Sequence, residues 1–399
     1  MKIPNNPFIG TNYIGFKEKI NVLKVLNSKS LFRYHGPNLL YMTDKLEEKI
    51  KQYLGVKYVL ACSNGASALK LSCIAYNIGN GDEVIMSPFT FIASASSVLA
   101  CGAIPKFVDI DASMNIDPTK IEKAITKKTK AIMCIHMQGQ CCDMNPIIEI
   151  ARKHNLIIIE DTAQAFGSEY NNKKSGTLGN IGAFSLQAGK TITCGEGGFI
   201  ATNDFSAYQK AKDYHDNGGH RVGCDYPTWN NGETSYGENY KLTELQSAVA
   251  LAQLGKINKI IKKQNKNFDY FNKYIKNTPY YSIRAKKQLN TNINVSLCLQ
   301  FKSQKECSDF ISFMNENNIP FNKYCTKLIN GYDVFIKKQG PNKSNYPFNL
   351  TDIEYTENDC PVAIDLINRT AWFNLSSQLR KKHIKYIISK MEEFQIANK

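Results

Sequence analysis

The sequence contains no long hydrophobic run. None of its 399 residues belongs to a stretch of ~18 uninterrupted apolar side chains, the length that a membrane-spanning helix needs. The opening residues, MKIPNNPFIGTNYIGFKEK, also lack the apolar segment of a secretory signal peptide. These absences argue against a membrane-spanning or secreted protein, and we expect a cytoplasmic one.

The twelve cysteines include no C-x-x-C pair. Cys141 and Cys142 are adjacent, which suits neither a zinc site nor an easily formed disulfide. Other cysteines lie within apolar runs, where a thiol behaves as a small hydrophobe: Cys62, Cys73, Cys101 and Cys134. We therefore predict reduced cysteines in the core and no metal site.

Acidic residues are too few to balance the basic ones, and the net charge is +15. The lysines are spread along the chain, and the densest clusters, 256–266 and 381–385, fall in segments with helical periodicity, as on solvated helix faces. No nucleic-acid-binding signature accompanies them, so we expect no nucleic-acid partner. A basic surface favours small anionic ligands instead, such as sugar nucleotides or sugar acids.

Short apolar runs alternate with helical patterns from about residue 58 onward. The expected strands are 58–63, 83–88, 105–110, 130–136, 156–161, 182–187 and 198–203, and the expected helices are 65–78, 91–101, 118–126 and 143–154. Near-continuous apolar strands between helices predict an α/β fold with a mostly parallel sheet covered on both faces. Because ligands of such sheets bind at the carboxyl ends of the strands, functional residues are expected there.

A long amphipathic pattern without proline runs from about 242 to 275 and predicts a helix that leads to a second domain. We place a large domain with an N-terminal arm at 1–255 and a smaller α+β domain at 256–399. The polar stretch 336–357 is expected to be a surface loop.

The stretch FSLQAGKTITCGEGG, at 184–198, contains Gly-Lys-Thr, as a phosphate-binding P-loop does. A P-loop also needs a glycine five residues before the glycine that precedes its lysine, and Phe184 occupies that position. A glycine turn leading into a strand replaces the helix that should follow. A P-loop kinase or ATPase is therefore disfavoured, and Lys190 needs another explanation.

Lys190 follows one expected strand, while Asp161 ends another and Gln164 comes one helical turn after it. Taken alone, Asp161 is better explained as a helix cap. A lysine opposite a buried carboxylate, however, suits pyridoxal phosphate, whose ring nitrogen must stay protonated to withdraw electrons. The lysine then forms a Schiff base and moves a proton between substrate and cofactor.

Two places offer donors for the cofactor's phosphate. CSNGAS, at 62–67, opens a helix, where the N–H groups of Gly65 and Ala66 would face an anion, and Ser185 could add a hydroxyl. Phe91 could lie flat on the pyridine ring. Each feature has an ordinary structural explanation, as a helix cap or a core aromatic, so only their convergence at neighbouring strand ends favours a cofactor.

Four segments together resemble the DegT/DnrJ/EryC1/StrS family of sugar aminotransferases: GDEVIMSPFTFIAS, IIIEDTAQAFGSEY, GAFSLQAGKTITCGEGGFIATND and GENYKLTELQSAVALAQL. The resemblance extends from LFRYHG at 31–36 to RTAWFNL at 369–375. It implies a fold-type I pyridoxal phosphate-dependent transferase, similar to aspartate aminotransferase, with a mostly parallel large domain and a smaller α+β C-terminal domain.

The resemblance also implies roles for individual residues. Lys190 would be the Schiff-base lysine, Asp161 the partner of the ring nitrogen, and Gln164 a contact near the ring hydroxyl. Asn239 would reach the phosphate of a neighbouring subunit, which implies a homodimer with shared sites. The remaining cofactor contacts would be Gly65, Ala66 and Ser185 at the phosphate and Phe91 on the ring.

Three positions distinguish this chain within the family. Ala66 stands where threonine is usual, which removes a hydroxyl but keeps the backbone donors. Lys241 stands where arginine is common, which replaces a bidentate fork with a point charge. Relatives that act as dehydratases carry histidine in place of the Schiff-base lysine, so Lys190 favours transamination.

Three other segments resemble 8-amino-3,8-dideoxy-octulosonate transaminase: KTITCGEGG, LFRY and DYHDNGGHRVG. His215 and His220 lie in the last of these; both are expected to be exposed loop histidines, or else His220 contacts sugar hydroxyls or a carboxylate. The insert 224–235 is expected to reshape the substrate pocket.

The sequence therefore predicts a ping-pong aminotransferase that moves an amino group from glutamate or glutamine to a keto- or aldehydo-sugar. Such a reaction belongs to amino-sugar or surface-polysaccharide biosynthesis, and the favoured substrate is 8-oxo-3-deoxy-octulosonate. The alternatives are a nucleotide-linked 4-keto-6-deoxy-sugar aminotransferase of the perosamine or viosamine type and a non-catalytic cofactor or sugar-nucleotide binding module.

Overall fold

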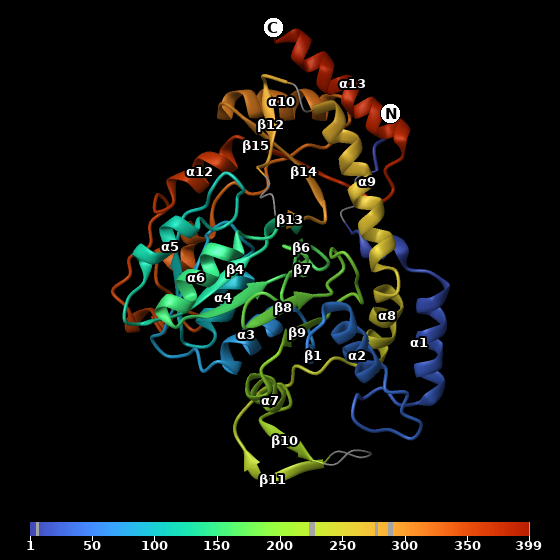
Figure 1. Cartoon of the computed structure of the whole chain (residues 1–399), viewed down its shortest axis with the longest axis vertical. Helices are drawn as coiled ribbons and strands as arrows, with labels where there is room; N and C mark the ends of the chain where they lie inside the picture. The colour runs from blue at the N-terminus through green and yellow to red at the C-terminus, as the bar shows by residue number, and fades with distance from the viewer. Residues whose placement is uncertain (5–7, 223–227, 276–277, 286–289, 399) are drawn as a thin grey trace.

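A seven-stranded sheet forms the centre of the molecule (Figure 1). The computed structural model describes residues 1–4, 8–222, 228–275, 278–285 and 290–398. The strand order is β1-β9-β8-β5-β4-β2-β3, and the strands are β1 (Tyr58–Cys62), β2 (Glu83–Met86), β3 (Ile104–Phe107), β4 (Thr129–Ile135), β5 (Ile157–Asp161), β8 (Ile181–Ser185) and β9 (Gly198–Thr202). All seven expected strands are confirmed with shifted ends.

The sheet is mostly parallel, as predicted. Strands β2, β3, β4, β5 and β8 pair in parallel, whereas β9 runs antiparallel to both of its neighbours, β1 and β8. The carboxyl ends of the parallel strands therefore share one edge with the beginning of β9. That edge receives the loops in which the predicted site residues lie.

Helices cover both faces of the sheet. The expected helices are confirmed as α3 (Gly65–Ala75), α4 (Ala93–Leu99), α5 (Pro118–Ala124) and α6 (Met144–His154). In β2, Val84 and Met86 face the apolar cluster that contains α3, α4 and α7 (Phe205–Tyr214), whereas Ile85 faces α5 and α6. This alternation explains why the strands are apolar throughout.

The expected helix over 242–275 is instead two helices, α8 (Glu244–Leu254) and α9 (Ile257–Ile275). The break falls at Gly255 and Lys256. Lys256 donates to the buried carboxylate of Glu18 and to the carbonyl of Tyr13, so a contact with α1 (Phe16–Ser28) fixes the chain at the break. In Figure 1, α8 and α9 form the yellow column beside α1.

The C-terminal part has its own three-stranded sheet, with the order β12-β14-β15. Its strands are β12 (Tyr281–Ile283), β14 (Ser296–Phe301) and β15 (Thr370–Asn374), and α10 (Gln304–Glu316) and α13 (Lys381–Ala397) pack on them around a separate apolar cluster. The α+β character predicted for this part is confirmed. The boundary between domains at residues 255 and 256 stays a prediction.

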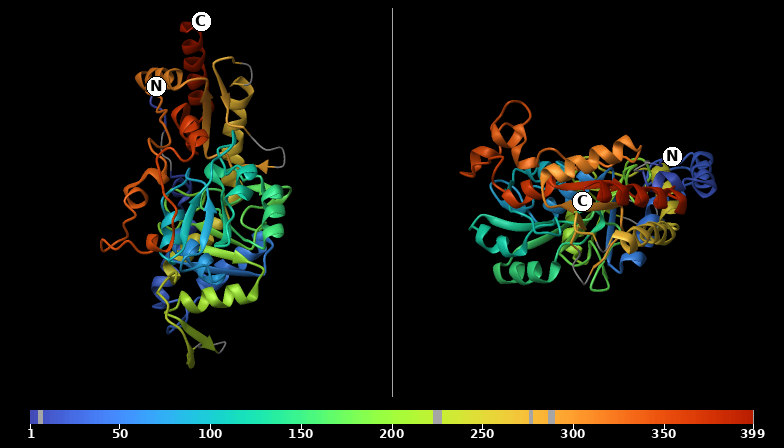
Figure 2. Two further views of the ribbon diagram at one scale, coloured as in Figure 1. Left: turned by 90° about the vertical axis from the view of Figure 1, so that its left-hand side faces the viewer. Right: turned by 90° about the horizontal axis from the view of Figure 1, so that it is seen from above.

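The stretch 336–357 is more than the surface loop that was expected. It follows η3 (Ile329–Gly331) and α11 (Asp333–Ile336), contains η4 (Phe348–Leu350) and precedes α12 (Pro361–Asn368). Phe348 and Tyr355 are buried, and the Tyr355 hydroxyl donates to the carbonyl of Pro105 in β3. Because the residues between these two aromatics are mostly polar, the sequence pattern did not show that Phe348 and Tyr355 are buried. Figure 2 (left) shows this orange segment projecting beside the central sheet.

The remaining elements are two 3₁₀ turns, one helix and two small sheets. They are η1 (Gly10–Tyr13), α2 (Met42–Leu54), η2 (Met137–Gly139), the small sheet of β6 (Glu169–Tyr170), β7 (Lys173–Lys174) and β13 (Asn290–Thr291), and the hairpin of β10 (Gly219–Val222) and β11 (Thr228–Thr234). The hairpin lies at the end of the molecule opposite the C-terminal sheet (Figures 1 and 2). Among the described helices, none is long and apolar enough to cross a membrane.

Candidate active site

Most of the predicted site residues come together at the carboxyl edge of the central sheet. Asp161 is the last residue of β5 and Ser185 the last residue of the adjacent strand β8. Lys190 lies in the turn after β8, and Gly65 begins α3 directly after β1. The parallel strand order thus gathers residues that are far apart in the sequence.

Asp161 is a buried carboxylate held by two donors. The Ser94 hydroxyl donates to Oδ2 at 2.8 Å, and the Ala163 N–H donates to Oδ1 at 3.1 Å. Thr90 pairs with the Ser94 hydroxyl at 2.8 Å, which orients it. These bonds fix both carboxylate oxygens of a side chain that is only 6% exposed.

Lys190 reaches a cavity of about 230 Å³. Its backbone is held in a turn, because its N–H donates to the carbonyl of Gln187 and its own carbonyl accepts the N–H of Gly10. Burial lowers the pKa of the Lys190 amine, although the carboxylates of Asp161 and Glu196 oppose that shift. Within the described residues the amine has no hydrogen-bond or ion-pair partner.

Gln164 and Phe91 line the same cavity as Lys190, together with Gln138 and Tyr324. The ring of Phe91 is 66% exposed, so it is not the core aromatic that its apolar surroundings also allowed. The Gln164 amide nitrogen lies 3.4 Å from the Tyr324 hydroxyl. The cavity therefore has an aromatic wall and polar groups that face the lysine.

The amino end of α3 adjoins Ser185. Asn64 caps the helix by accepting the N–H of Ser67, and the first intrahelical bond runs from Ala68 to Asn64. The N–H groups of Gly65 and Ala66 precede that bond and remain available to an anion. A Cβ on Gly65 would lie 2.8 Å from the Ser185 Cβ, so the helix end and the hydroxyl are in close contact.

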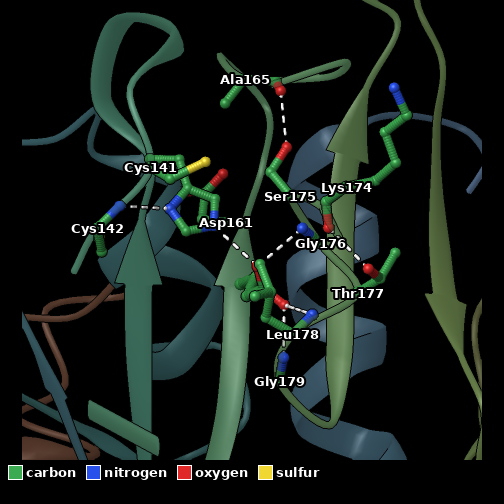
Figure 3. Close-up of polar contacts among 12 residues, drawn as sticks. Cys141, Cys142, Asp161, Ala165, Lys174, Ser175, Gly176, Thr177, Leu178 and Gly179 are labelled. Carbon is green, nitrogen blue, oxygen red and sulfur yellow. Dashed lines mark hydrogen bonds and ion pairs between the residues drawn. The ribbon is translucent and has the colours of Figure 1, made fainter. Parts of the chain in front are cut away.

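Glu160, next to Asp161, is fully buried and fastens the neighbouring loop. Its carboxylate accepts the N–H groups of Gly176 at 2.7 Å and of Leu178 and Gly179 at 2.6 Å, as Figure 3 shows. It also lies 2.9 Å from Nε2 of buried His136.

His136 Nδ1 accepts the N–H of Cys142, so Nε2 carries the proton and donates to Glu160. The backbone N–H of His136 donates to the carbonyl of Asp161. The end of β5 is thereby held from both sides of the strand.

Of the predicted site residues, Phe91, Gln164 and Lys190 line the cavity itself, and Asn239 and His220 do not. Asn239 is exposed, and its side chain accepts the N–H of Lys241. His220, on β10, is half-buried and contacts Asp213 and Gln209. Within the chain, therefore, neither Asn239 nor His220 joins Lys190.

The expectation that His215 is exposed is wrong. His215 is fully buried at the end of α7, and Nε2 lies 3.5 Å from the Tyr34 hydroxyl. Burial and the nearby Arg33 cation lower its pKa to about 3. Of the insert 224–235, residues 224–227 lie outside the described residues, and most of the rest is β11.

Sequence reasoning missed Ser94, Gln138 and Tyr324. Ser94 comes three residues after Phe91 on the opening turn of α4, and that spacing was a usable signal. Gln138 follows β4 at the same carboxyl edge. Tyr324 comes from the C-terminal part, 160 residues after Gln164, and no local pattern connects the two.

The burial expected for four of the cysteines is confirmed in part. Cys62, Cys73 and Cys134 are buried, whereas Cys101 is only partly so. All cysteines within the described ranges are free thiols, and no group of three or more His, Cys, Asp or Glu residues in those ranges is arranged to hold a metal ion.

The residues present fit pyridoxal phosphate. They supply an amine with a lowered pKa and no partner in the described part of the chain, a fixed buried carboxylate, and a helix end whose first N–H groups precede the first intrahelical bond. A solved aminotransferase from Psychrobacter cryohalolentis matches with a TM-score of 0.85 and 30% identity, covering 99% of each chain. The protein therefore has the fold of the pyridoxal phosphate-dependent aminotransferases.

A family model identifies the family within this class to which the chain belongs. The model of the DegT/DnrJ/EryC1/StrS aminotransferase family matches residues 13–392, and the chain belongs to that family. It is a family of pyridoxal phosphate-dependent enzymes that includes sugar aminotransferases, so the fold, cofactor and enzyme class inferred from the sequence are confirmed.

Relatives of known name match shorter stretches. GDP-perosamine synthase of Caulobacter vibrioides is 46% identical over 53% of this chain and 56% of its own length. dTDP-3-amino-3,6-dideoxy-alpha-D-galactopyranose transaminase of Aneurinibacillus thermoaerophilus is 41% identical over 59% of this chain and 63% of its own length. The matched region thus spans less than two thirds of either relative.

Proposed function

We propose that this protein transfers an amino group to a keto-sugar, with Lys190 as the reacting amine. The observation that carries the proposal is the Lys190 side chain, which lacks a partner among the described residues and shares a cavity with Gln164 and Phe91. Its lowered pKa leaves more of the amine unprotonated near neutral pH, and only that form is nucleophilic.

Bound pyridoxal phosphate supplies an electron sink for the carbon that exchanges the amino group. Ser94 and Ala163 donate to the two oxygens of Asp161 and hold its side chain in place, and this carboxylate would hold a proton on the ring nitrogen. Lys190, once free as an amine, would accept the proton from the substrate carbon at Nζ and deliver it to the cofactor carbon that takes over the amino group.

The amino end of α3 is the proposed phosphate site. The N–H groups of Gly65 and Ala66 and the hydroxyl of Ser185 would bind the phosphate oxygens, and the helix dipole favours that charge. Phe91 would cover the ring, since its side chain is exposed in the cavity wall.

Two further residues are proposed to act across a subunit interface. Asn239 is exposed outside the cavity of its own chain, so it is available to the phosphate site of a second copy in a homodimer. His220 is likewise proposed to contact the sugar from a neighbouring subunit. Large apolar side chains on and beside α1, including Phe16 at 77% exposed, favour such an interface.

We propose a nucleotide-linked keto-sugar as the acceptor, ahead of the oxidised octulosonate. The names of the two relatives, a GDP-perosamine synthase and a dTDP-amino-sugar transaminase, support a nucleoside-diphosphate sugar. The net charge of +15 would attract such an anion. Glutamate or glutamine is the proposed donor.

The test is the second half of the reaction. Protein loaded with pyridoxamine phosphate is mixed with a GDP-linked 4-keto-6-deoxy-sugar, its dTDP counterpart or the oxidised octulosonate, and the cofactor spectrum is followed. We expect rapid return of the pyridoxal phosphate spectrum with a nucleotide-linked sugar, its loss in Lys190→Ala and its retention in the exposed control Lys173→Ala. Rapid reaction with the octulosonate but with neither nucleotide-linked sugar would overturn the substrate proposal. If none of the three sugars reacts, the proposed function itself is overturned.

A further inference from the structure

Gln138 has an unusual backbone conformation beside the candidate active site. Within η2 its φ and ψ are 52° and 40°, in the left-handed region that non-glycine residues seldom adopt, and Gly139 follows with a φ of 80°. A Cβ on Gly139 would lie 1.9 Å from the carbonyl oxygen of Ile293, and the Ser168 hydroxyl donates to the Gly139 carbonyl at 2.6 Å. The contacts with Ile293 and Ser168 therefore fix this backbone conformation.

The conformation directs two donors of Gln138 at one acceptor. The backbone N–H and the side-chain Nε2 of Gln138 both donate to Oε1 of Gln164, each at 3.1 Å. A backbone N–H can only donate, so the oxygen of the Gln164 amide must face Gln138. The Gln164 nitrogen must then face the other way, towards the Tyr324 hydroxyl and the cavity of Lys190.

The orientation of Gln138 is fixed in turn by the C-terminal sheet. Ser296, the first residue of β14, donates its hydroxyl proton to Oε1 of Gln138 at 2.9 Å. Because the oxygen of Gln138 is engaged there, its nitrogen is left for Gln164. A chain of hydrogen bonds thus runs from Ser296 through Gln138 to Gln164.

We propose that Gln138 is a positioning residue that holds the Gln164 amide with its N–H donor facing the cofactor. The inference rests on the proposed function and on the contact between Gln164 and the ring hydroxyl oxygen of pyridoxal phosphate that the family resemblance implies. That oxygen accepts hydrogen bonds, so a reversed amide would present oxygen to oxygen and weaken binding. Gln138 itself contacts the Gln164 amide and acts through it.

Gln138→Glu tests the proposal with little change in shape. A carboxylate oxygen would replace the Nε2 donor and repel Oε1 of Gln164, while the backbone N–H would still oppose a reversed amide. We expect the dissociation constant of pyridoxal phosphate, measured by equilibrium dialysis, to rise about tenfold, the effect of ~1.4 kcal/mol. The absorption maximum of the bound cofactor should also shift, since its ring oxygen loses a fixed donor.

Gln140→Leu is the matched control. Gln140 is a buried glutamine two residues further on, and its Nε2 donates to the carbonyl of Ala285 rather than to Gln164. We expect this variant to bind pyridoxal phosphate within twofold of the unmodified protein. A loss equal to that of Gln138→Glu would show that any damage to this loop weakens the site, and would overturn the positioning role.

A double variant separates positioning from general packing. If Gln138 acts through Gln164, adding Gln138→Glu to Gln164→Ala should cause no further loss of cofactor affinity, whereas a fully additive loss would overturn the proposal. Should Gln138→Glu fail to fold, Gln138→Leu replaces it in the same cycle with an expected two- to fivefold loss. Failure of the unmodified protein to bind pyridoxal phosphate would instead contradict the proposed function.

Discussion

Replacing Glu160 with glutamine should loosen the loop that supports Asp161. The Glu160 carboxylate accepts four donors, the N–H groups of Gly176, Leu178 and Gly179 and the Nε2–H of His136. Whichever way the new amide lies, its NH₂ faces two of these donors. Two hydrogen bonds are lost and two buried donors are left unpaired, at about 1–3 kcal/mol each, so the expected loss is ~2–6 kcal/mol.

Hydrogen exchange is the suitable assay, because a chain of 399 residues with several separate apolar clusters need not unfold in one step. In Glu160→Gln, the amides that the new NH₂ faces, either Leu178 and Gly179 or Gly176, should exchange at least about 30-fold faster, which corresponds to ~2 kcal/mol. The control is Glu122→Gln, which removes an exposed carboxylate on α5 paired with Lys153. Unchanged exchange at all three amides, Gly176, Leu178 and Gly179, would refute the reasoning.

Three further predictions follow from single groups. Gly65→Ala places a Cβ 2.8 Å from Ser185 at the phosphate site, so affinity for pyridoxal phosphate should fall about tenfold in equilibrium dialysis; unchanged affinity would contradict the placement. Because the pKa of Lys190 is lowered, reductive methylation of the cofactor-free protein should reach half its maximal rate at a lower pH at Lys190 than at exposed Lys173. Mass spectrometry can follow both sites, and equal midpoints would contradict the prediction. The pKa of buried His215 is lowered to about 3, so below pH ~6.5 the unfolded state binds a proton that the folded state does not, and stability falls as pH drops. His215→Leu should therefore make the unfolding temperature decline less steeply between pH 7 and 4.5. An equally steep decline in the variant would exclude His215 as the cause.

Local pattern was enough to predict the central sheet and most of its site. Apolar runs such as 156–161 identify buried strands, and residues directly after a parallel strand must lie at its carboxyl edge. Asp161, Ser185 and Lys190 were found by that rule. The residue types then indicated the cofactor.

Non-local contacts explain what local pattern missed. The break before α9 depends on Lys256 reaching Glu18, which lies 238 residues earlier, and the hydrophobic periodicity continues through it. His215 looks exposed in the polar stretch DYHDNGG, yet it contacts Tyr34, which is 181 residues earlier. The left-handed backbone conformation of Gln138 was likewise not predictable, because glutamine seldom adopts it.

The most direct test of the account is to locate the lysine that bonds to the cofactor. Pyridoxal phosphate is added to the purified protein, the adduct is reduced with borohydride, and peptides are sequenced by mass spectrometry. The account predicts the cofactor on Lys190, with no adduct in Lys190→Ala and full labelling in Lys173→Ala. Labelling of another lysine, or an adduct that survives Lys190→Ala, would contradict it.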